Sequence, residues 1–421
     1  MVTPLRRALR RAGSAPAPDP QQPPAPPPPA AGQEEIRRQN LGAMLRYVHL
    51  HGPTSRAELT GRLGLNRSTI GALAAELVAS GLVTEEVPTT PRRAGRPSLV
   101  VSPRSVRVYA TAVSVEPERL RVARIGLGGR ILDLREAPRP HGSALLDAVP
   151  AVAALIRESE RELAADAFCA GGAAAVADTT RDDDGTVHVT GGDETFAVAL
   201  DAALVGDGPG RRGFVWGDLA DIAALAEHTR GVAAGVDDLV YLHGDLGVSA
   251  GIVTGGRLVT GHGGRSGKVG HMVVHPHGRR CGCGSRGCWE TEVGVAALLR
   301  RAAAPPGTSA LAVVRAAALG DSTARDALHG VADWLGFGVA NLVNVFNPDI
   351  VVFGGTLREV YAAAAGTVRH RVDTMALPAS REHLQLRAGA LGPDAPLIGA
   401  AELAFENLLT DPLLGPAAGS Q

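Results

Sequence analysis

The 421-residue chain is short of lysine, of cysteine and of net charge, and it has no long apolar run. Lys268 is the single lysine, so arginine carries nearly all of the positive charge. Because the net charge is only −1, any contact with nucleic acid must come from a local basic patch. No stretch approaches the ~20 uninterrupted apolar residues of a membrane span, and the basic N-terminal segment lacks the apolar core of a secretory signal. We therefore expect a cytoplasmic protein with no membrane contact.

The chain does contain enough hydrophobic residues for a substantial core, together with a tract rich in proline and alanine. Hydrophobic residues make up 45% of the chain and charged residues 20%, which is typical of soluble globular proteins. From Pro16 to Pro29 the sequence is mostly Pro and Ala, a composition that cannot pack a core. We expect residues 1–32 to be a disordered tail and residues 412–421 to be a second tail.

Three of the four cysteines lie within eight residues of each other, as Cys281, Cys283 and Cys288, and His271 precedes them. Without a secretory signal a disulfide framework is not expected. One imidazole and three thiolates are typical of a closed, structural zinc site, so Zn²⁺ is the predicted cofactor. The alternative is a set of reduced cysteines in a glycine-rich loop, but so dense a cluster favours the metal. Cys169 stands alone in an apolar run and is predicted to be buried.

Residues 33–102 have the pattern of a winged helix-turn-helix. A helix with apolar residues at helical spacing ends at Gly52-Pro53. Ser55 and Glu58 form a capping box for a second helix, and Asn66 is a favourable N-cap for a third. Residues 82–87 and 98–102 alternate as two strands of a wing, with the basic loop 91–97 between them. Helix, turn and helix behind a supporting helix is the DNA-binding plan.

This first unit also carries local positive charge. Residues 33–101 contain nine arginines and six glutamates, a local net charge of about +3. The helices are predicted to contact the major groove and the DNA phosphates, and the wing is predicted to contact the minor groove. The DNA-binding residues are predicted to be Ser55, Arg56, Asn66, Arg67, Ser68, Thr69, Arg92, Arg93 and Arg96. The alternative is a plain three-helix bundle with a solvated loop, and the Gly-Arg-Pro sequence in that loop favours DNA binding.

These features together resemble the ROK family of repressors and sugar kinases over about residues 33–409. The most specific segments are SRAELTGRLGLNRSTIGALAAELVASGLV from residue 55, the AGRP wing, the GH…CxCGxxGCxE pattern between Gly270 and Glu290, and NLVNVFNPDIVVFGGTL from residue 341. The resemblance implies an α/β fold, in which an N-terminal winged helix-turn-helix precedes a two-lobed, actin-like sugar-kinase body.

The resemblance also implies where the parts of that body lie. The body spans residues 104–411, with lobes at about 104–217 and 218–395, and a C-terminal helix at 396–409 that returns to the first lobe. Residues 108–115, 120–126 and 130–134 have the pattern of an antiparallel meander, and 239–243 and 350–353 that of buried strands. In the DNA-binding members a sugar tunes operator affinity and zinc braces the sugar-binding loop. The implied effector contacts are Asp218, Lys268, His271 and Glu290.

The chain departs from the family at the positions needed for phosphoryl transfer. The first phosphate loop, Asp-x-Gly-Gly-Thr, corresponds to Ser114–Glu118, where Glu116, Pro117 and Glu118 repel a triphosphate and remove an amide donor. Leu246 replaces the threonine of the second loop, and Leu219 stands at the catalytic aspartate. An alignment shifted by one residue would make Asp218 the base. We predict that the chain is not a kinase.

The sequence therefore predicts a DNA-binding transcriptional regulator, in the first place a repressor. Its expected partners are operator DNA, a sugar or sugar-derivative effector, and further copies of itself in a dimer or tetramer. The alternatives are an ATP-dependent sugar kinase with an accessory DNA-binding domain, and a ligand-independent regulator whose body serves only dimerisation. Lys268, at a position where the family has glutamate, could favour an acidic sugar; the alternatives are an internal ion pair or a surface charge.

Overall fold

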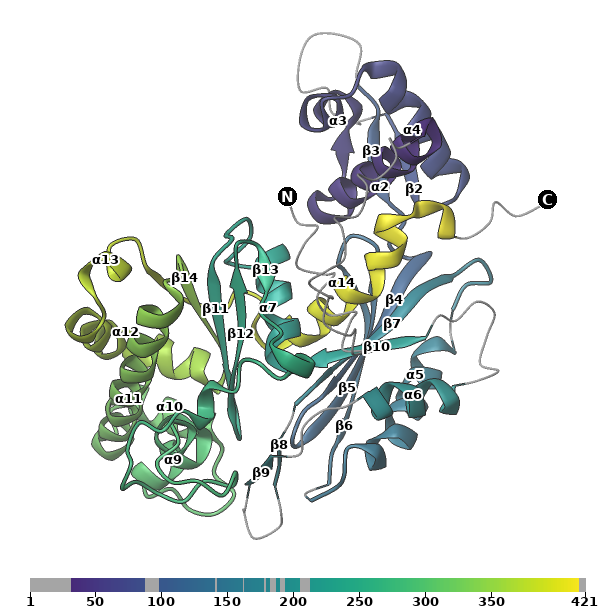
Figure 1. Ribbon diagram of the computed structural model, residues 1–421. Coiled ribbons are helices and arrows are strands. Elements are labelled where there is room, and N and C mark those ends of the chain that lie inside the picture. The colour runs from purple at the N-terminus through teal and green to yellow at the C-terminus, as the bar shows by residue number, and fades with distance from the viewer. Residues whose placement is uncertain are drawn as a thin grey trace, which may run out of the picture.

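The computed structural model describes residues 32–87, 98–140, 142–161, 163–177, 179–181, 187–189, 194–204 and 213–415 (Figure 1). The predicted N-terminal tail up to residue 31 and most of the wing loop, with Arg92, Arg93 and Arg96, lie outside these residues. Within the part of the chain that is described, no helix is both long and apolar enough to cross a lipid bilayer.

The N-terminal unit is a small helical bundle closed by a three-stranded antiparallel sheet. Its elements are α2 (Gln33–His51), β1 (Thr54–Ser55), α3 (Arg56–Leu63), α4 (Arg67–Ala79), β2 (Val83–Glu86) and β3 (Val100–Pro103), and the strand order is β1-β3-β2. Both predicted caps are present, since Ser55 caps α3 and Asn66 caps α4. Leu45, Leu59 and Ile70 are fully buried, one from each helix, so the three helices share one core.

The first lobe is built on a five-stranded mixed sheet of order β10-β7-β4-β5-β6. The antiparallel meander β4–β5–β6 is continued by β7 and β10, which run parallel to β4. The elements are β4 (Val108–Val115), β5 (Arg119–Gly126), β6 (Ile131–Pro138), η1 (Leu146–Ala148), α5 (Val149–Glu160), β7 (Phe168–Val176), β8 (Thr179–Arg181), β9 (Val187–Val189), α6 (Glu194–Ala203) and β10 (Phe214–Asp218). The three predicted strands of the meander are confirmed.

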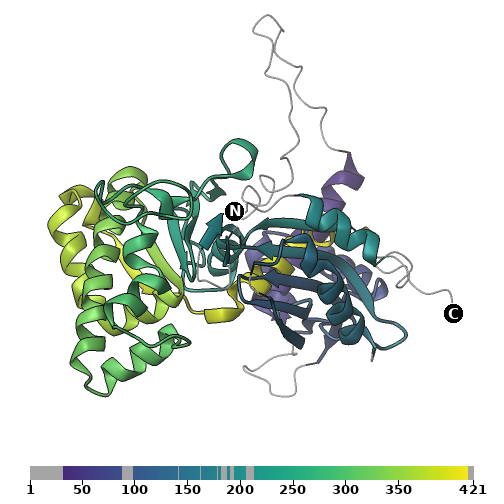
Figure 2. The ribbon, with the colours of Figure 1, turned by 90° about the horizontal axis from the view of Figure 1, so that it is seen from below.

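The second lobe has its own five-stranded sheet of order β13-β12-β11-β14-β15, covered by a layer of helices. Figure 2 shows the helices α10, α11 and α12 on the side of this lobe that faces away from the first. The strands are β11 (Leu239–Gly244), β12 (Val248–Thr254), β13 (Arg257–Leu258), β14 (Ile350–Gly355) and β15 (Gln385–Ala388). The helices are α7 (Leu219–Thr229), η2 (His262–Gly264), η3 (Val269–His271), α8 (Glu290–Val293), α9 (Val295–Arg301), α10 (Ala310–Ala318), α11 (Ser322–Phe346), α12 (Thr356–Met375) and α13 (Pro378–Arg381).

The last long helix, α14 (Ala395–Thr410), joins the three parts of the molecule. It follows η4 (Gly392–Asp394), packs on α7 and on strands β4 and β7, and ends beside α2, as Figure 1 shows. Nearly all of its residues are buried, which its apolar sequence explains. The predicted C-terminal tail begins at Pro412, where the chain instead forms η5 (Pro412–Leu414) and Pro412 is buried. The two-lobed α/β fold with a helix-turn-helix unit is confirmed.

Candidate functional site

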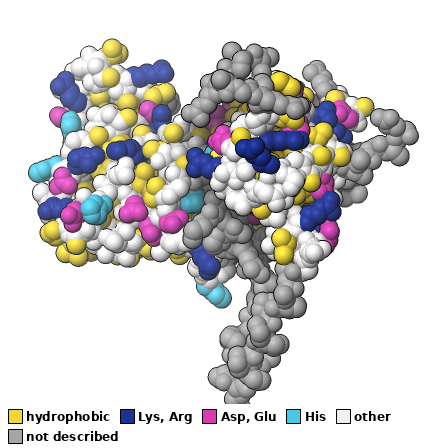
Figure 3. Space-filling view, turned by 90° about the horizontal axis from the view of Figure 1, so that it is seen from above, with side chains coloured by type: hydrophobic (Ala, Val, Ile, Leu, Met, Phe, Trp, Pro, Cys, Tyr) yellow, Lys and Arg dark blue, Asp and Glu magenta, His cyan; other side chains and the backbone are white. Residues whose placement is uncertain are grey.

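The exposed start of α4 is the candidate DNA-contacting surface. The Asn66 Oδ1 atom accepts hydrogen bonds from the Thr69 backbone N at 2.8 Å and from the Ser68 hydroxyl at 2.7 Å. Arg67 and Ser68 are exposed, and Figure 3 looks down on this end of the molecule, where arginine side chains lie on its surface. The cap therefore fixes the first turn of α4 while leaving the Arg67 side chain in solvent.

Two predicted DNA contacts have structural partners instead. The Ser55 hydroxyl accepts from the Glu58 backbone N at 3.2 Å, which is the α3 cap. The Arg56 guanidinium donates to both carboxylate oxygens of Glu85 on β2, with Nη2 at 2.5 Å from Oε2. A DNA phosphate would have to replace Glu85, so Arg56 serves in this structure to attach α3 to the wing strand.

The predicted metal cluster is assembled in the structure. The Nδ1 atom of His271 and the sulfurs of Cys281, Cys283 and Cys288 all lie within 4.8 Å of one another. The His271 Nδ1 atom is 3.7 Å from the Cys281 sulfur, and the Cys283 and Cys288 sulfurs are 3.6 Å apart. Around a tetrahedral zinc ion, bond lengths of ~2.3 Å to sulfur and ~2.0 Å to nitrogen place two sulfurs about 3.8 Å apart and a sulfur and a nitrogen about 3.5 Å apart. The donor set therefore fits zinc.

The loop that carries these ligands is shaped by tight backbone packing. Residue pairs Val273–Cys288 and Arg280–Arg286 form antiparallel bridges, which bring the two ends of the loop together. Gly287 has a φ of 68°, and a Cβ there would lie 1.6 Å from the His275 carbonyl oxygen, so only glycine fits. Burial, with the carboxylate of Glu290 nearby, raises the pKa of the Cys281 thiol. In the absence of metal this thiol therefore keeps its proton and donates it to Glu290 at 2.8 Å.

The four predicted effector residues line one cavity between the lobes. Asp218 comes from the end of β10, while Lys268, His271 and Glu290 come from the second lobe. The Lys268 Nζ atom donates to Asp218 Oδ2 at 2.5 Å, so the ion-pair alternative for Lys268 is what the structure shows. The cavity has a volume of about 30 Å³.

The positions predicted to correspond to the phosphate loops carry apolar and carboxylate side chains. Pro117, Leu219 and Leu246 present hydrocarbon to the same cavity. The Ser114 hydroxyl donates to Glu116 Oε1 at 3.0 Å, and Glu116 also pairs with Arg119. A carboxylate thus lies directly after β4, where the family's glycines would admit phosphate.

A histidine–aspartate pair next to this loop was not predicted from the sequence. His243 Nε2 lies 3.0 Å from Asp245 Oδ2, and Asp245 Oδ1 accepts from the Thr356 hydroxyl at 2.9 Å. Burial acts to lower the pKa of His243, but the hydrogen bond and charge of Asp245 outweigh it, and the pKa is raised. The His243 Nδ1 atom has no hydrogen-bond partner among the described residues. The signal in the sequence was a histidine and an aspartate on either side of the glycine that ends β11.

Asp221 was not singled out in the sequence, and Cys169 differs from its prediction. Asp221 points from α7 into the protein interior, and its Oδ1 atom has no partner among the described residues. Burial, together with the negative charge of Asp218, raises its pKa well above the ordinary value. Cys169, predicted to be buried, is half-buried and lies 3.7 Å from the Thr111 hydroxyl. The apolar run around it belongs to β7, and only its later residues face the core on both sides.

Comparisons with known proteins agree with this arrangement. The family model described as "ROK family" matches residues 118–407. The chain is 26% identical over 378 residues to the DNA-binding transcriptional dual regulator NagC of Escherichia coli K12, covering 83% of this chain and 88% of that protein. It is 31% identical over 306 residues to the N-acetylmannosamine kinase of Escherichia fergusonii, covering 70% of this chain and 97% of the kinase.

A similar solved structure covers the helix-turn-helix unit as well as the body. It is a ROK family transcriptional regulator, described as a homologue of the E. coli MLC protein, with 25% sequence identity and a TM-score of 0.70. The superposition covers 90% of this chain and 98% of that structure. The regulators therefore match a longer part of the chain than the kinase does.

Proposed function

Since this chain belongs to the ROK family, we propose that it is a DNA-binding transcriptional regulator, and a repressor in the absence of its effector. One observation carries the proposal: a capped recognition helix, α4, presents its exposed first turn on a helix-turn-helix unit that is joined to the family's two-lobed body. In this motif the N-terminal residues of the second helix contact base edges in the major groove. Relatives described as transcriptional regulators match the chain over both parts.

Within this proposal the DNA-contacting residues have distinct roles. Arg67 and Ser68 reach the bases or the phosphates, and Thr69 supports them from the same turn. Asn66 and Ser55 act through their caps, because their side-chain oxygens are already bonded. Arg92, Arg93 and Arg96 stay proposed minor-groove contacts of the wing. A two-fold homo-oligomer would place two copies of α4 on a palindromic operator.

Zinc is proposed as a structural ion held by His271, Cys281, Cys283 and Cys288. An ion bound by four protein ligands has no open position for water, so it supplies rigidity to the loop and no reaction chemistry. His271 sits in both the metal cluster and the cavity wall, so the ordered loop positions the cavity residues Lys268 and Glu290.

The effector is proposed to be a sugar or sugar derivative that binds between the lobes. The carboxylates of Asp218 and Glu290 can accept hydrogen bonds from sugar hydroxyl groups, and the His271 ring can also bind one. An acidic sugar remains a specific candidate, because its carboxylate could take the place of Asp218 on Lys268. Calorimetry with N-acetylmannosamine, glucose and glucuronate tests this. Tighter binding of glucuronate that is lost in Lys268→Ala supports the acidic ligand, and unchanged affinity in that variant contradicts it.

We propose no phosphoryl-transfer activity. Leu219 and Leu246 can neither accept a proton nor bind phosphate, and Glu116 repels it. Incubation with ATP and the same sugars should produce no ADP, with a ROK family sugar kinase assayed in parallel as the positive control. ADP release that depends on the sugar would restore the kinase alternative.

The decisive experiment is a binding assay on the DNA that adjoins the protein's own gene. Footprinting should protect a palindromic segment at nanomolar protein, and a shuffled fragment of the same composition should bind at least about a thousandfold more weakly. Equal affinity for both fragments would contradict the proposed function. Addition of an effector identified by calorimetry should reduce the protection.

A further inference from the structure

The DNA-binding unit contacts the body through the last long helix. Helix α2 lies along α14, and Gly42 allows a close approach, because a Cβ there would lie 2.8 Å from the Leu409 carbonyl oxygen. One helical turn on, Arg46 forms a two-pronged ion pair with Glu406, with N···O distances of 3.0 and 3.2 Å. Both side chains are mostly buried, so α2 is held to α14 along its length.

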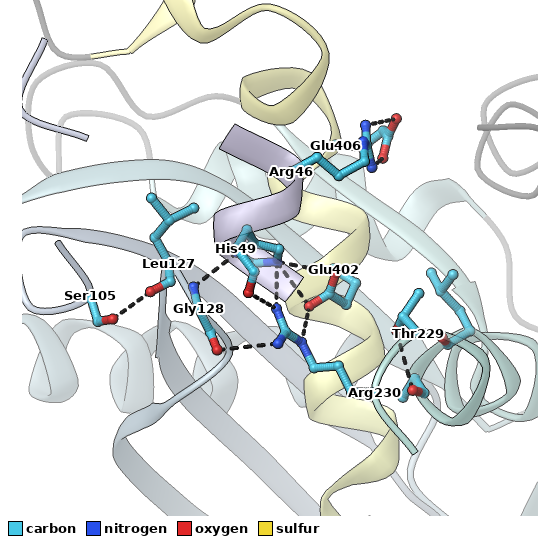
Figure 4. Close-up of polar contacts among 11 residues, drawn as sticks. Arg46, His49, Ser105, Leu127, Gly128, Thr229, Arg230, Glu402 and Glu406 are labelled. Carbon is cyan, nitrogen blue, oxygen red and sulfur yellow. Dashed lines mark hydrogen bonds and ion pairs between the residues drawn. The ribbon is translucent and has the colours of Figure 1, made fainter. Parts of the chain in front are cut away.

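At the end of α2 lies a buried polar cluster, which we call the α2 junction and define as His49, Gly128, Arg230 and Glu402 (Figure 4). The Arg230 Nε atom donates to Glu402 at 2.5 Å, Nη2 to the His49 carbonyl at 3.0 Å, and Nη1 to the Gly128 carbonyl at 3.2 Å. The exposed fraction is 0% for the His49 side chain and 1% for that of Glu402. One guanidinium thus binds three segments of the chain together.

The protonation of His49 follows from its neighbours. The Gly128 backbone N donates to His49 Nδ1 at 2.9 Å, so Nδ1 must be unprotonated. The proton of the neutral ring is then on Nε2, which donates to Glu402 at 3.0 Å. The Arg230 Nη2 atom also lies 2.7 Å from His49 Nε2, and the Arg230 Nε atom donates to the same Glu402 oxygen that His49 contacts. The hydrogen bonds of the α2 junction therefore require the side chains of His49, Arg230 and Glu402 to keep their relative positions.

Arg230 directly follows α7, and the other end of α7 lies in the cavity between the lobes. Asp218 is the N-cap of this helix and the partner of Lys268. Asp218 and Arg230 are twelve positions apart, which in a helix is about 18 Å. Every residue from Leu219 to His228 is buried. The helix is therefore an enclosed connection between the cavity and the α2 junction.

Neighbouring elements pack closely on α7 at several points along its length. A Cβ on Gly399 of α14 would lie 1.9 Å from the Ile222 carbonyl oxygen, and a Cβ on Gly251 of β12 would lie 2.4 Å from that of Ala220. Near its end, Glu227 accepts from the backbone N of Leu391, in the segment that leads to α14. In so closely packed a helix we expect a displacement at Asp218 to be passed along the axis and not absorbed by bending.

We propose that α7 transmits the state of the cavity to the DNA-binding unit, with the Lys268–Asp218 ion pair as the sensing contact and Arg230 as the positioning residue at the α2 junction. Both partners of this ion pair line the cavity, so a ligand that binds either side chain must compete with the pair. Separation frees the N-terminal end of α7, and Arg230 carries that change to His49 and thus to the orientation of α2.

This inference rests on the proposed function only for its biological meaning, because the linkage can be tested without DNA or effector. Amide hydrogen exchange is carried out on the full-length protein, and the exchange rate is read from the peptide that contains residues 47–51 of α2. Lys268→Met breaks the sensing contact from the second lobe without altering α7. It should speed exchange in that peptide about fivefold, the lower end of typical coupling between sites.

The decisive comparison is the same substitution in an Arg230→Gln background. Arg230→Gln should itself raise exchange in α2, and adding Lys268→Met should then change it no further. If Lys268→Met leaves the α2 peptide unchanged in the native background, or has the same effect with and without Arg230, the linkage is wrong. Arg230→Lys keeps the positive charge beside Glu402 but loses the hydrogen bonds to the His49 and Gly128 carbonyls, so it should give partial coupling. This variant replaces Arg230→Gln in the comparison if the glutamine variant does not fold.

Two control variants test whether the effect is specific to the contacts at the two ends of α7. Arg257→Met removes an exposed cation from the same lobe, and Arg371→Gln removes a two-pronged ion pair with Asp333 that is remote from α2; neither should alter exchange in residues 47–51. Operator binding then separates the two proposals. If the protein binds its operator but Lys268→Met does not change exchange in α2, only this inference is contradicted. If the exchange coupling is present but the protein binds no operator, only the proposed function is contradicted.

Discussion

The cationic side chains of this protein differ in whether a carboxylate of the same chain already binds them. Arg56 pairs with Glu85, and Lys268 pairs with Asp218. A ligand that binds either cation must first displace its carboxylate. Arg67 differs, since it is exposed on the first turn of α4. Among these three residues, Arg67 is therefore the one that can meet DNA without breaking an internal ion pair.

Arg67→Ala should weaken operator binding by about 1–3 kcal/mol, as expected for the loss of an arginine contact to a base or phosphate. Fluorescence anisotropy on the footprinted segment measures it. Arg315→Ala, which removes an exposed arginine from α10 in the second lobe, is the matched control and should bind normally. Full affinity in Arg67→Ala would show that α4 does not enter the groove as proposed.

Asp221→Asn tests the buried carboxyl group. Because the folded state raises the pKa of Asp221, its protonated form favours folding, and that contribution is complete below the ordinary pKa and is lost as pH rises through the raised value. Asparagine mimics the neutral form at every pH. The variant should therefore gain about 2 °C in Tm relative to the native protein between pH 5 and pH 8. Exposed Asp326→Asn should show no such trend, and an equal trend in both would refute the assignment.

At the scale of elements, the features that could be predicted are those set by neighbours in sequence. The Ser55 and Asn66 caps and the meander of the first lobe follow from local pattern, as does the cysteine spacing that assembles the metal cluster. What could not be predicted is how helices dock. Helix α14 did carry a signal, because Glu402 and Glu406 are one turn apart in an otherwise apolar helix and need buried partners.

Cys281→Ser should reduce bound zinc from one per chain to nearly none and lower the Tm by several degrees, because metal binding stabilises the folded loop. Metal content by mass spectrometry and thermal melting measure the two effects. Cys169→Ser is the control, since Cys169 lies in β7 outside the cluster and should leave the zinc content unchanged. Zinc retained in Cys281→Ser would remove the ligand assignment.

Gly399→Ala should destabilise the protein by about 1–3 kcal/mol, because the added methyl group would overlap the Ile222 carbonyl where α14 crosses α7. A Cβ on the exposed helical Gly366 of α12 would meet no atom within 4 Å, so Gly366→Ala should be neutral or stabilising by up to about 1 kcal/mol. Denaturant unfolding compares the two variants. Equal effects would mean that α7 and α14 are not in close contact.

For the whole molecule, the order of the domains and the two-lobed plan could be predicted, because they follow from motifs and from family resemblance. The α2 junction could not, since His49 and Glu402 are 353 residues apart and no local pattern pairs them. The same is true of Arg121, which links β5 to Asp394 before α14. The α2 junction holds the DNA-binding unit to the body, the Arg121 contact lies within the body, and both depend on the complete fold.

Operator affinity should fall steeply with salt although the whole chain is nearly neutral. If each dimer neutralises roughly four to eight phosphates, a plot of log K against log salt should have a slope of about −4 to −7. Titrations from about 50 to 200 mM salt measure it. Affinity that does not change with salt would show that the arginines of the first unit do not contact the DNA backbone.

The position of α14 has a consequence for how the protein is made. The surface on which α2 docks is translated 353 residues after His49, which at ordinary elongation rates is a delay of roughly 20 to 70 seconds. During that interval a nascent chain already contains Gly128 and Arg230 but lacks α14, the helix against which α2 packs. A ribosome-bound or prematurely terminated product would therefore read DNA, if at all, without the control that the finished body imposes.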